Sequence, residues 1–177
     1  IYEGVTTYLG DKYLWKTGVY SDSAYAKELE IKVIRHLHNP GRTSLSLADS
    51  SVDTWVDGYE QGTPWRKVSI YNEGALVSMI IDAKIHQLSA GKKGIEDWMK
   101  VLMSAKPLAS GGYDQKDLET TLYTACGWQA KEFFDLYVYG TQDMMPLVRE
   151  ALVQLGWNLA FEANTKLHER LYGCKLD

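Results

Sequence analysis

Residues 74–88 read GALVSMIIDAKIHQL and are the most apolar helical stretch of this sequence. The large aliphatic side chains recur at helical spacing and form a wide stripe: Leu76, Val77, Ile80, Ile81 and Ile85. A stripe this wide is typical of a helix at the centre of a domain, because a surface helix keeps a broad polar face. The sequence therefore predicts a central helix from Gly74 to about Leu88.

Shorter helical patterns flank this central stretch. We expect helices over residues 2–9, 21–38, 50–59, 95–105, 114–126, 130–139 and 146–155. Ser21 and Asp114 are suitable N-caps, and Gly127 suits the position after a helix. Residues 42–49 indicate a polar, partly extended connector, and the alternation over residues 157–164 favours a strand. No repeat or linker divides residues 1–177, so we predict one mainly α-helical unit with little or no sheet.

Composition places the chain among ordinary globular domains. It has 177 residues, of which 45% are hydrophobic and 24% are charged. The formal net charge of −4 argues against nonspecific nucleic-acid binding, which needs clustered Lys and Arg. No apolar run approaches the roughly 20 residues that span a bilayer. Cys126 and Cys174 allow a disulfide or two free thiols, so the cellular compartment stays undetermined.

The first residues favour a fragment of a longer protein. The chain opens on Ile1 without Met or a signal-peptide pattern, and no Ser, Thr, Asp or Asn precedes the expected first helix. A processed N-terminus is the alternative. A fragment would expose apolar surface that formerly faced the missing part, around Ile1, Val5 and Leu9. We therefore expect a dimer or crystal contact at that face.

Common catalytic motifs are absent from the sequence. It contains no His-Glu-x-x-His, no Gly-x-Ser-x-Gly and no phosphate-binding glycine loop. His36 and His38 would lie about 200° apart on a helix, so they cannot bind one metal ion together, and we interpret the histidines as surface or packing residues. Two segments stand out, Glu3 to Tyr8 and Ser69 to Leu76, although each has an ordinary structural explanation.

Taken together and in order, several segments resemble the glycyl-aminopeptidase family of zinc metallopeptidases. The matching segments are Glu3 to Tyr8, Asn39 to Arg42, Ser50 to Trp55, Ser69 to Leu76, Gly91-Lys92, Gly112-Tyr113, Asp117-Leu118 and Glu132 to Gly140. The family belongs to the gluzincin class, in which zinc is held by two histidines of His-Glu-x-x-His and a later glutamate. The resemblance implies that this chain is the C-terminal helical half of a thermolysin-like catalytic domain.

The resemblance also implies roles for individual residues. Glu3 matches the third zinc ligand, and Tyr71 matches the tyrosine that donates a hydrogen bond to the oxyanion of the tetrahedral intermediate. Thr6, Tyr8 and Gly74 are candidates for lining the cleft or supporting the ligands. The chain departs from the family at Glu73, where a lysine is usual, and at Ile70, where a second aromatic residue is frequent.

By this resemblance, the His-Glu-x-x-His helix would precede Ile1, so the chain lacks two zinc ligands and the general base. The intact protein would be a zinc aminopeptidase that removes small residues such as Gly or Ala. This fragment alone would be inactive and would hold no zinc, because one carboxylate does not bind the ion usefully. The expected partners are a peptide substrate, the upstream half of the polypeptide and a PDZ-like domain that relatives often carry.

Two other functions fit the residues. Aromatic residues make up 12% of the chain, so a noncatalytic helical module could hold a peptide or glycan in an aromatic groove. A structural or assembly domain would instead form a stable oligomer without zinc. The residues preceding Ile1 in the intact protein distinguish the enzyme from the binding module.

Overall fold

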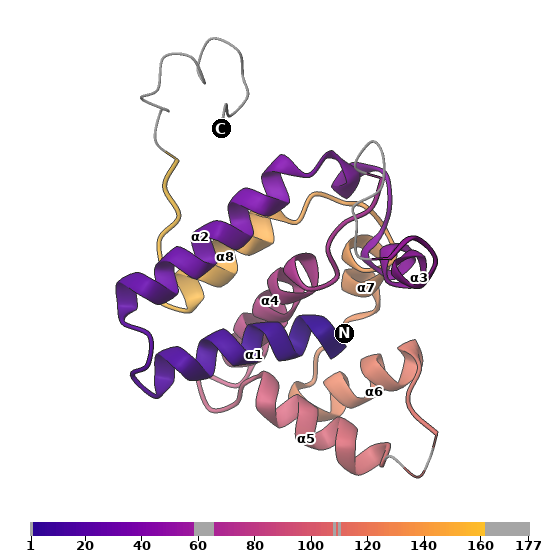
Figure 1. The fold of residues 1–177 in the computed structure, drawn as a ribbon. Helices are drawn as coiled ribbons and strands as arrows, with labels where there is room; N and C mark the ends of the chain where they lie inside the picture. Colours follow the sequence, from indigo (N-terminus) through magenta and orange to yellow (C-terminus); the bar gives the residue numbers. More distant parts are fainter. Residues whose placement is uncertain (1, 59–65, 108, 110, 162–177) are drawn as a thin grey trace, which may run out of the picture.

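The computed structural model describes residues 2–58, 66–107, 109 and 111–161. These residues form α-helices joined by short turns and no strand (Figure 1), which confirms the predicted mainly α-helical class. The helices are α1 (Tyr2–Lys16), α2 (Asp22–His38), α3 (Leu47–Asp57), α4 (Asn72–Leu88), α5 (Ile95–Ala105), α6 (Gln115–Cys126), α7 (Lys131–Tyr137) and α8 (Met145–Gln154), with a 3-10 turn at Pro40–Thr43. No helix among these residues is long and apolar enough to cross a membrane.

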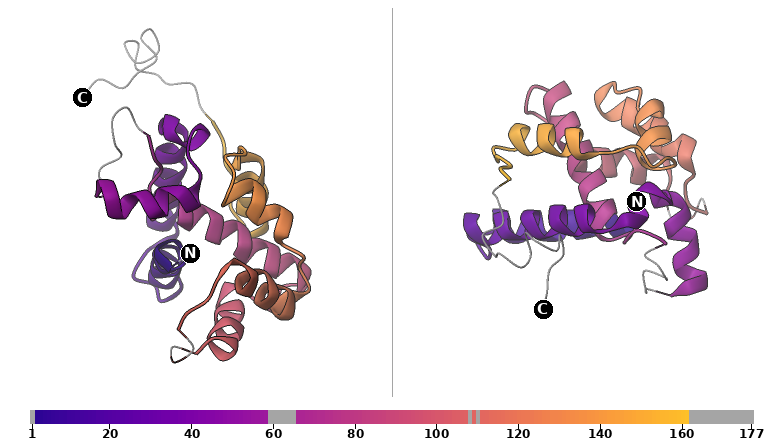
Figure 2. Two further views of the ribbon diagram at one scale, coloured as in Figure 1. Left: turned by 90° about the vertical axis from the view of Figure 1, so that its right-hand side faces the viewer. Right: turned by 90° about the horizontal axis from the view of Figure 1, so that it is seen from above.

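Helix α4 is the centre of the domain, as its apolar stripe predicts. Thirteen of its 17 residues are buried, and it contacts α1, α2, α5 and α8. Helices α1 and α8 lie on opposite sides of α4, while α5 and α6 pack against each other as a pair (Figure 2). Helix α4 is thus covered by other helices from several directions.

Several helix boundaries follow from the expected capping residues. The Ser21 hydroxyl accepts a hydrogen bond from Ala24 N, and Asp114 forms a capping box with Asp117. Gly127 ends α6 in the left-handed conformation, with a φ of 77°, which a residue with a side chain rarely adopts. These signals are local, so the sequence alone places α2 and α6 correctly.

Two expectations about the N-terminal third are wrong. Helix α1 continues beyond Leu9 to Lys16, and the segment expected as an extended connector contains the start of α3. Ser46 caps this helix by accepting a hydrogen bond from Asp49 N at 3.0 Å. The polar residues of 42–49 therefore include a helix cap, and the predicted end of this helix at Tyr59 lies outside the described residues.

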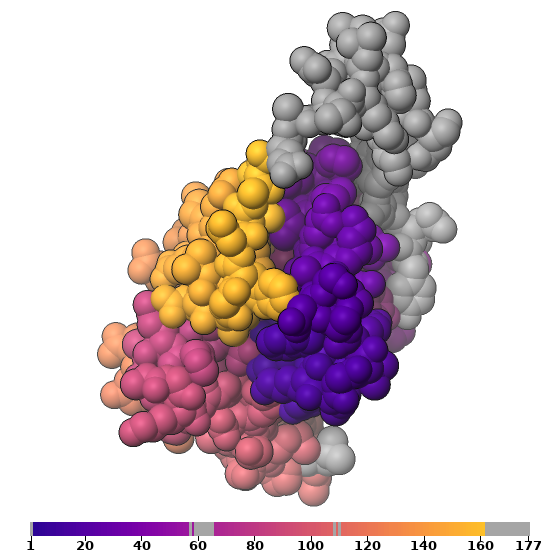
Figure 3. Space-filling view, turned by 90° about the vertical axis from the view of Figure 1, so that its left-hand side faces the viewer, coloured from indigo at the N-terminus to yellow at the C-terminus, as the bar shows by residue number. Residues whose placement is uncertain are grey.

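The expected strand is also wrong over the described residues 157–161, which have no regular secondary structure. Their alternation has another cause, because Trp157 packs into an aromatic cluster that joins the first two helices. Its ring centroid lies 5.7 Å from Trp15 and 5.8 Å from Tyr25. Figure 3 shows the yellow C-terminal end of the described chain beside the indigo and purple N-terminal helices. The remaining expected strand residues, 162–164, lie outside the described part.

The apolar surface expected at Val5 and Leu9 is not exposed. Val5 is 5% exposed and Leu9 is half-buried, because α1 packs on α4. Ile1 and Cys174 lie outside the described residues. Large exposed apolar side chains lie instead on α3, where Val52, Trp55 and Val56 are 67%, 87% and 80% exposed. Among the described residues, the exposed apolar surface is therefore on α3 rather than around Val5 and Leu9.

Candidate functional site

Two glycines bring the backbones of α1 and α4 into direct contact. A Cβ atom built on Gly4 would lie 2.4–2.5 Å from backbone atoms of Gly74. A Cβ on Gly74 would lie 2.7 Å from the Gly4 Cα. Carbon atoms do not approach this closely, so neither position accommodates a side chain. The two glycines therefore set how closely the helices cross.

This crossing positions Glu3 at the edge of a hollow. Glu3 directly precedes Gly4 and is exposed. Together with Gly74 it lines a hollow of about 350 Å³, which we call the Glu3 hollow. Its other lining residues are Tyr2, Leu47, Ala48, Ser51, Trp55, Ile70, Val77, Val138 and Tyr139. The wall opposite the carboxylate is thus largely apolar and aromatic.

Tyr71 directly precedes α4 as its N-cap residue, three residues before Gly74, and is 37% exposed. It lines a separate hollow of about 230 Å³, the Tyr71 hollow. The other residues of this hollow are Thr7, Lys32, Arg35, Asn39, Ser69, Asn72 and Glu73. Thr7 and Glu3 come from the same turn region of α1. The structure therefore brings Glu3 and Tyr71 to one helix crossing, while their side chains line neighbouring hollows.

The other two candidates on α1 line neither hollow. The Thr6 hydroxyl donates to its own helix, with Oγ1 2.8 Å from the carbonyl oxygen of Tyr2. Tyr8 is 3% exposed, and its hydroxyl donates to Asp82 Oδ2 at 2.6 Å. Burial, together with the negative charge of Asp82, raises the pKa of the Tyr8 phenol well above its usual value. Tyr8 belongs to a buried polar cluster of the core.

Asp82 is the centre of that cluster, which no sequence motif indicated. Its Oδ2 also accepts from Lys12 Nζ at 2.7 Å, and its Oδ1 accepts from the backbone nitrogen of Ile95 at 2.8 Å. Burial lowers the pKa of Lys12, but hydrogen bonding and attraction to Asp82 and Glu96 outweigh it, so the pKa is raised. The available signal in the sequence for this buried cluster was Asp82, the single acidic residue within residues 74–88.

A second buried pair supports the first turn of α4. His36 Nδ1 lies 2.6 Å from Glu73 Oε2, and both side chains are 3% exposed. His36 is thus a packing residue, as expected. Glu73, where the family usually has lysine, joins α2 to the turn that follows Tyr71. The neighbouring Asn72 strengthens this junction, because its Nδ2 donates to the carbonyl oxygen of Lys32 at 3.0 Å.

No group of three or more His, Cys, Asp or Glu side chains suited to a metal ion occurs within the described ranges. Glu3 offers a carboxylate, which is a ligand type that zinc accepts. A catalytic zinc site needs three protein ligands. The described residues therefore do not form a zinc site on their own, and a zinc ion at Glu3 would need further ligands from outside them.

The helical arrangement is similar to part of a solved aminopeptidase family structure. The chain is similar to the crystal structure of the aminopeptidase N family protein from Idiomarina loihiensis, with a TM-score of 0.74 and 25% identity. The similarity covers 84% of this chain but 26% of the other, so the chain spans about a quarter of that protein's length.

The N-terminal part of the chain has a more specific match. Residues 1–77 match the M61 glycyl aminopeptidase family, which confirms the resemblance found in the sequence. The match includes Glu3, Gly4, Tyr71 and Gly74, and thus both helices of the crossing. No curated protein matches the chain.

Proposed function

We propose that this chain is the C-terminal helical half of the catalytic domain of a zinc-dependent aminopeptidase. In this proposal Glu3 supplies one zinc ligand, and the two histidines and the general base come from another part of the polypeptide. Zinc, when bound, polarises the scissile carbonyl and activates a water molecule. The proposal rests on the family match over residues 1–77. The proposal also explains why a glutamate, Glu3, directly precedes Gly4.

The Gly4–Gly74 contact is the structural observation that supports the proposal. It holds the turn of α1 that bears Glu3 against the first turn of α4, which follows Tyr71. A ligand and an oxyanion donor must keep a fixed separation, because a hydrogen-bond donor acts only where negative charge develops. Backbone contact between two helices is more rigid than contact between side chains. A close backbone crossing of this kind supports the proposed pairing of Glu3 with Tyr71.

The proposed role of Tyr71 is to donate its phenolic hydrogen to the oxyanion of the tetrahedral intermediate. The His36–Glu73 and Asn72–Lys32 contacts hold the turn that follows this residue. The substrate is a peptide, and the family match suggests a small N-terminal residue such as Gly or Ala. The partners in this proposal are the upstream half of the catalytic domain and a PDZ-like domain.

The test uses the intact polypeptide, with zinc content and peptidase turnover measured separately. Glu3→Gln is expected to lower bound zinc, whereas Tyr71→Phe keeps zinc and lowers turnover by about 10²–10³-fold. Glu30→Gln and Tyr123→Phe are matched controls, because both residues are exposed on other helices. Full zinc content in Glu3→Gln would contradict the ligand role. Chelator-sensitive hydrolysis of Gly-anilide by the 177-residue chain alone would contradict the fragment interpretation.

The exposed apolar face of α3 favours a second candidate, a noncatalytic peptide-binding module. Trp55 is 87% exposed at the margin of the Glu3 hollow, where an aromatic side chain offers rigid contact area. This candidate predicts that the intact protein binds apolar peptides without zinc. An intact His-Glu-x-x-His upstream and chelator-sensitive activity would exclude it.

A further inference from the structure

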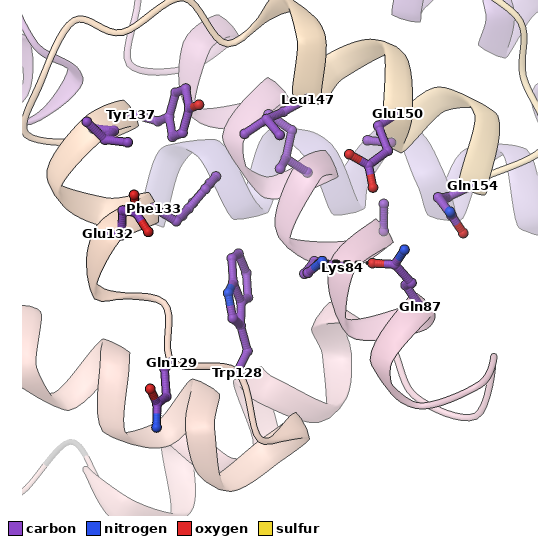
Figure 4. Close-up of a pocket in the computed structure, with 14 residues that line it drawn as sticks. Lys84, Gln87, Trp128, Gln129, Glu132, Phe133, Tyr137, Leu147, Glu150 and Gln154 are labelled. Carbon is purple, nitrogen blue, oxygen red and sulfur yellow. Dashed lines mark hydrogen bonds between the residues drawn. The ribbon is translucent and has the colours of Figure 1, made fainter.

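A third cavity lies farther along α4, beside the half of the helix that follows the Glu3 hollow. It has a volume of about 300 Å³ and is formed by α4, α7 and α8 (Figure 4). Its apolar floor consists of Ile80, Ala83, Leu147 and Ala151. It shares no lining residue with the Glu3 hollow or the Tyr71 hollow. The volume is at the lower end of the range of small-molecule sites.

Aromatic rings form one wall of this cavity. Trp128 precedes α7, and its ring centroid lies 5.1 Å from that of Phe133. The Phe133 ring in turn lies 5.5 Å from Tyr137, and Phe133 is 7% exposed. Figure 4 shows Trp128 standing in the space between α4 and α7. Rings that support one another in this way present a firm face to a ligand.

The rim carries more negative than positive charge. Glu132 on α7 and Glu150 on α8 line the cavity, and neither forms an ion pair with the residues that the structure describes. Lys84 is the cation of this rim, and its Nζ donates to Gln87 Oε1 at 2.9 Å. The carboxylates of Glu132 and Glu150 would repel an anionic ligand here and attract a cationic one.

We propose that this cavity binds a small organic cation with an apolar or aromatic body. The body packs on the floor and on Trp128, and the ammonium group lies toward Glu132 and Glu150. Attraction of a cation to an indole face adds to attraction by the carboxylates. This proposal does not depend on the aminopeptidase proposal, because the two sites share no residue.

Three probes with the same phenyl body but different charge test the proposal on the 177-residue chain. Phenethylamine, 2-phenylethanol and 3-phenylpropionate are titrated separately, and binding is followed by backbone amide chemical shifts. We expect phenethylamine to bind with a Kd of about 1 mM, the order set by its few heavy atoms. The alcohol is expected to bind roughly three- to tenfold more weakly, and the carboxylate more weakly still. Added salt should narrow these differences.

The variant Glu132→Gln with Glu150→Gln removes both charges and keeps similar side-chain sizes. Both residues are exposed, so the fold is retained, and circular dichroism verifies this. The variant is expected to lose the preference for the amine while its affinity for the alcohol stays unchanged. Trp128→Phe is expected to weaken the amine more than the alcohol. Glu30→Gln, an exposed carboxylate on α2, is the control and should change nothing.

Three results would overturn the proposal. They are equal affinity for the three probes, survival of the amine preference in the double variant, and chemical-shift changes centred away from α4, α7 and α8. Chemical shifts that map to the cavity together with a charge-dependent Kd would support it. Failure of this test would leave zinc content and turnover in the Glu3 and Tyr71 variants unaffected.

Discussion

Replacing Gly4 by Ala tests the helix crossing on which the proposed site depends. The added Cβ would lie 2.4–2.5 Å from the Gly74 backbone, whereas ordinary contacts are 3.4–4 Å. Backbone atoms cannot rotate away as a side chain does, so the helices must separate. Overpacking of this kind costs about 1–3 kcal/mol. Ala also favours the helix by about 1 kcal/mol over Gly, which partly offsets the cost.

Gly10→Ala is the matched control for this effect. Gly10 lies on the same helix, is exposed, and has no atom within 4 Å of the position that a Cβ would occupy. Ala gains the same helix propensity there without a clash. The difference in unfolding free energy between the two variants therefore isolates the contact at the crossing. We expect Gly10→Ala to be the more stable variant by about 1–3 kcal/mol.

The assay is urea unfolding of the purified chain, followed by circular dichroism, with thermal unfolding as a second measurement. For a chain of this size each kcal/mol corresponds to about 2–4 °C in Tm. Gly74→Ala should reproduce the loss, because its Cβ would lie 2.7 Å from the Gly4 Cα. Equal stability of Gly4→Ala and Gly10→Ala would refute the tight crossing and, with it, the geometric argument for Glu3 and Tyr71.

Three further predictions concern the buried polar groups and a helix cap. The unfolding free energy should fall as pH rises above about 10. The fold raises the pKa values of Tyr8 and Lys12 from 10.0 and 10.5, so the unfolded chain loses these protons first. Urea unfolding at several pH values measures this fall, and the same dependence of unfolding free energy on pH in Tyr8→Phe would contradict it. His36→Leu or Glu73→Leu alone should lower the unfolding free energy by about 3–5 kcal/mol, because each single change leaves a buried polar side chain without its partner. The double variant should lose less than the sum of the two, and additive losses in this double-mutant cycle would show that the pair is not coupled. Asp114→Ala should cost about 1 kcal/mol through loss of its cap on α6, measured as a lower Tm; an unchanged Tm would indicate that the cap contributes nothing.

The fold could be predicted from the sequence wherever its signals are local. The stripe of residues 74–88 identifies α4, and Ser21 and Asp114 mark the starts of α2 and α6. The start of α3 was missed because its cap, Ser46, is one of several serines in residues 43–51, a composition that also suits a loop. The alternation over residues 157–160 reflects the half-burial of Trp157 and Leu159 between exposed neighbours, and no strand is needed for that pattern.

The candidate site was less accessible, because its geometry depends on residues far apart in the chain. Glu3 and Tyr71 were identified by resemblance, but the reason for their glycines appears only in the contact between Gly4 and Gly74. No periodicity connects two residues that are 70 positions apart. The His36–Glu73 pair has the same cause, since a pattern along one helix does not show which side chain on another helix faces it.

The cluster around Asp82 has a consequence for how the domain opens. One carboxylate joins α4 to Tyr8 and Lys12 of α1 and to the first residue of α5, Ile95. If α1 detached alone, it would leave a negative charge without its main partners in the interior, which is costly. These three helices should therefore come apart as one cooperative unit. Amide protons in the middle of α1 would then exchange with solvent no faster than those of α4, although α1 is the first helix of the chain.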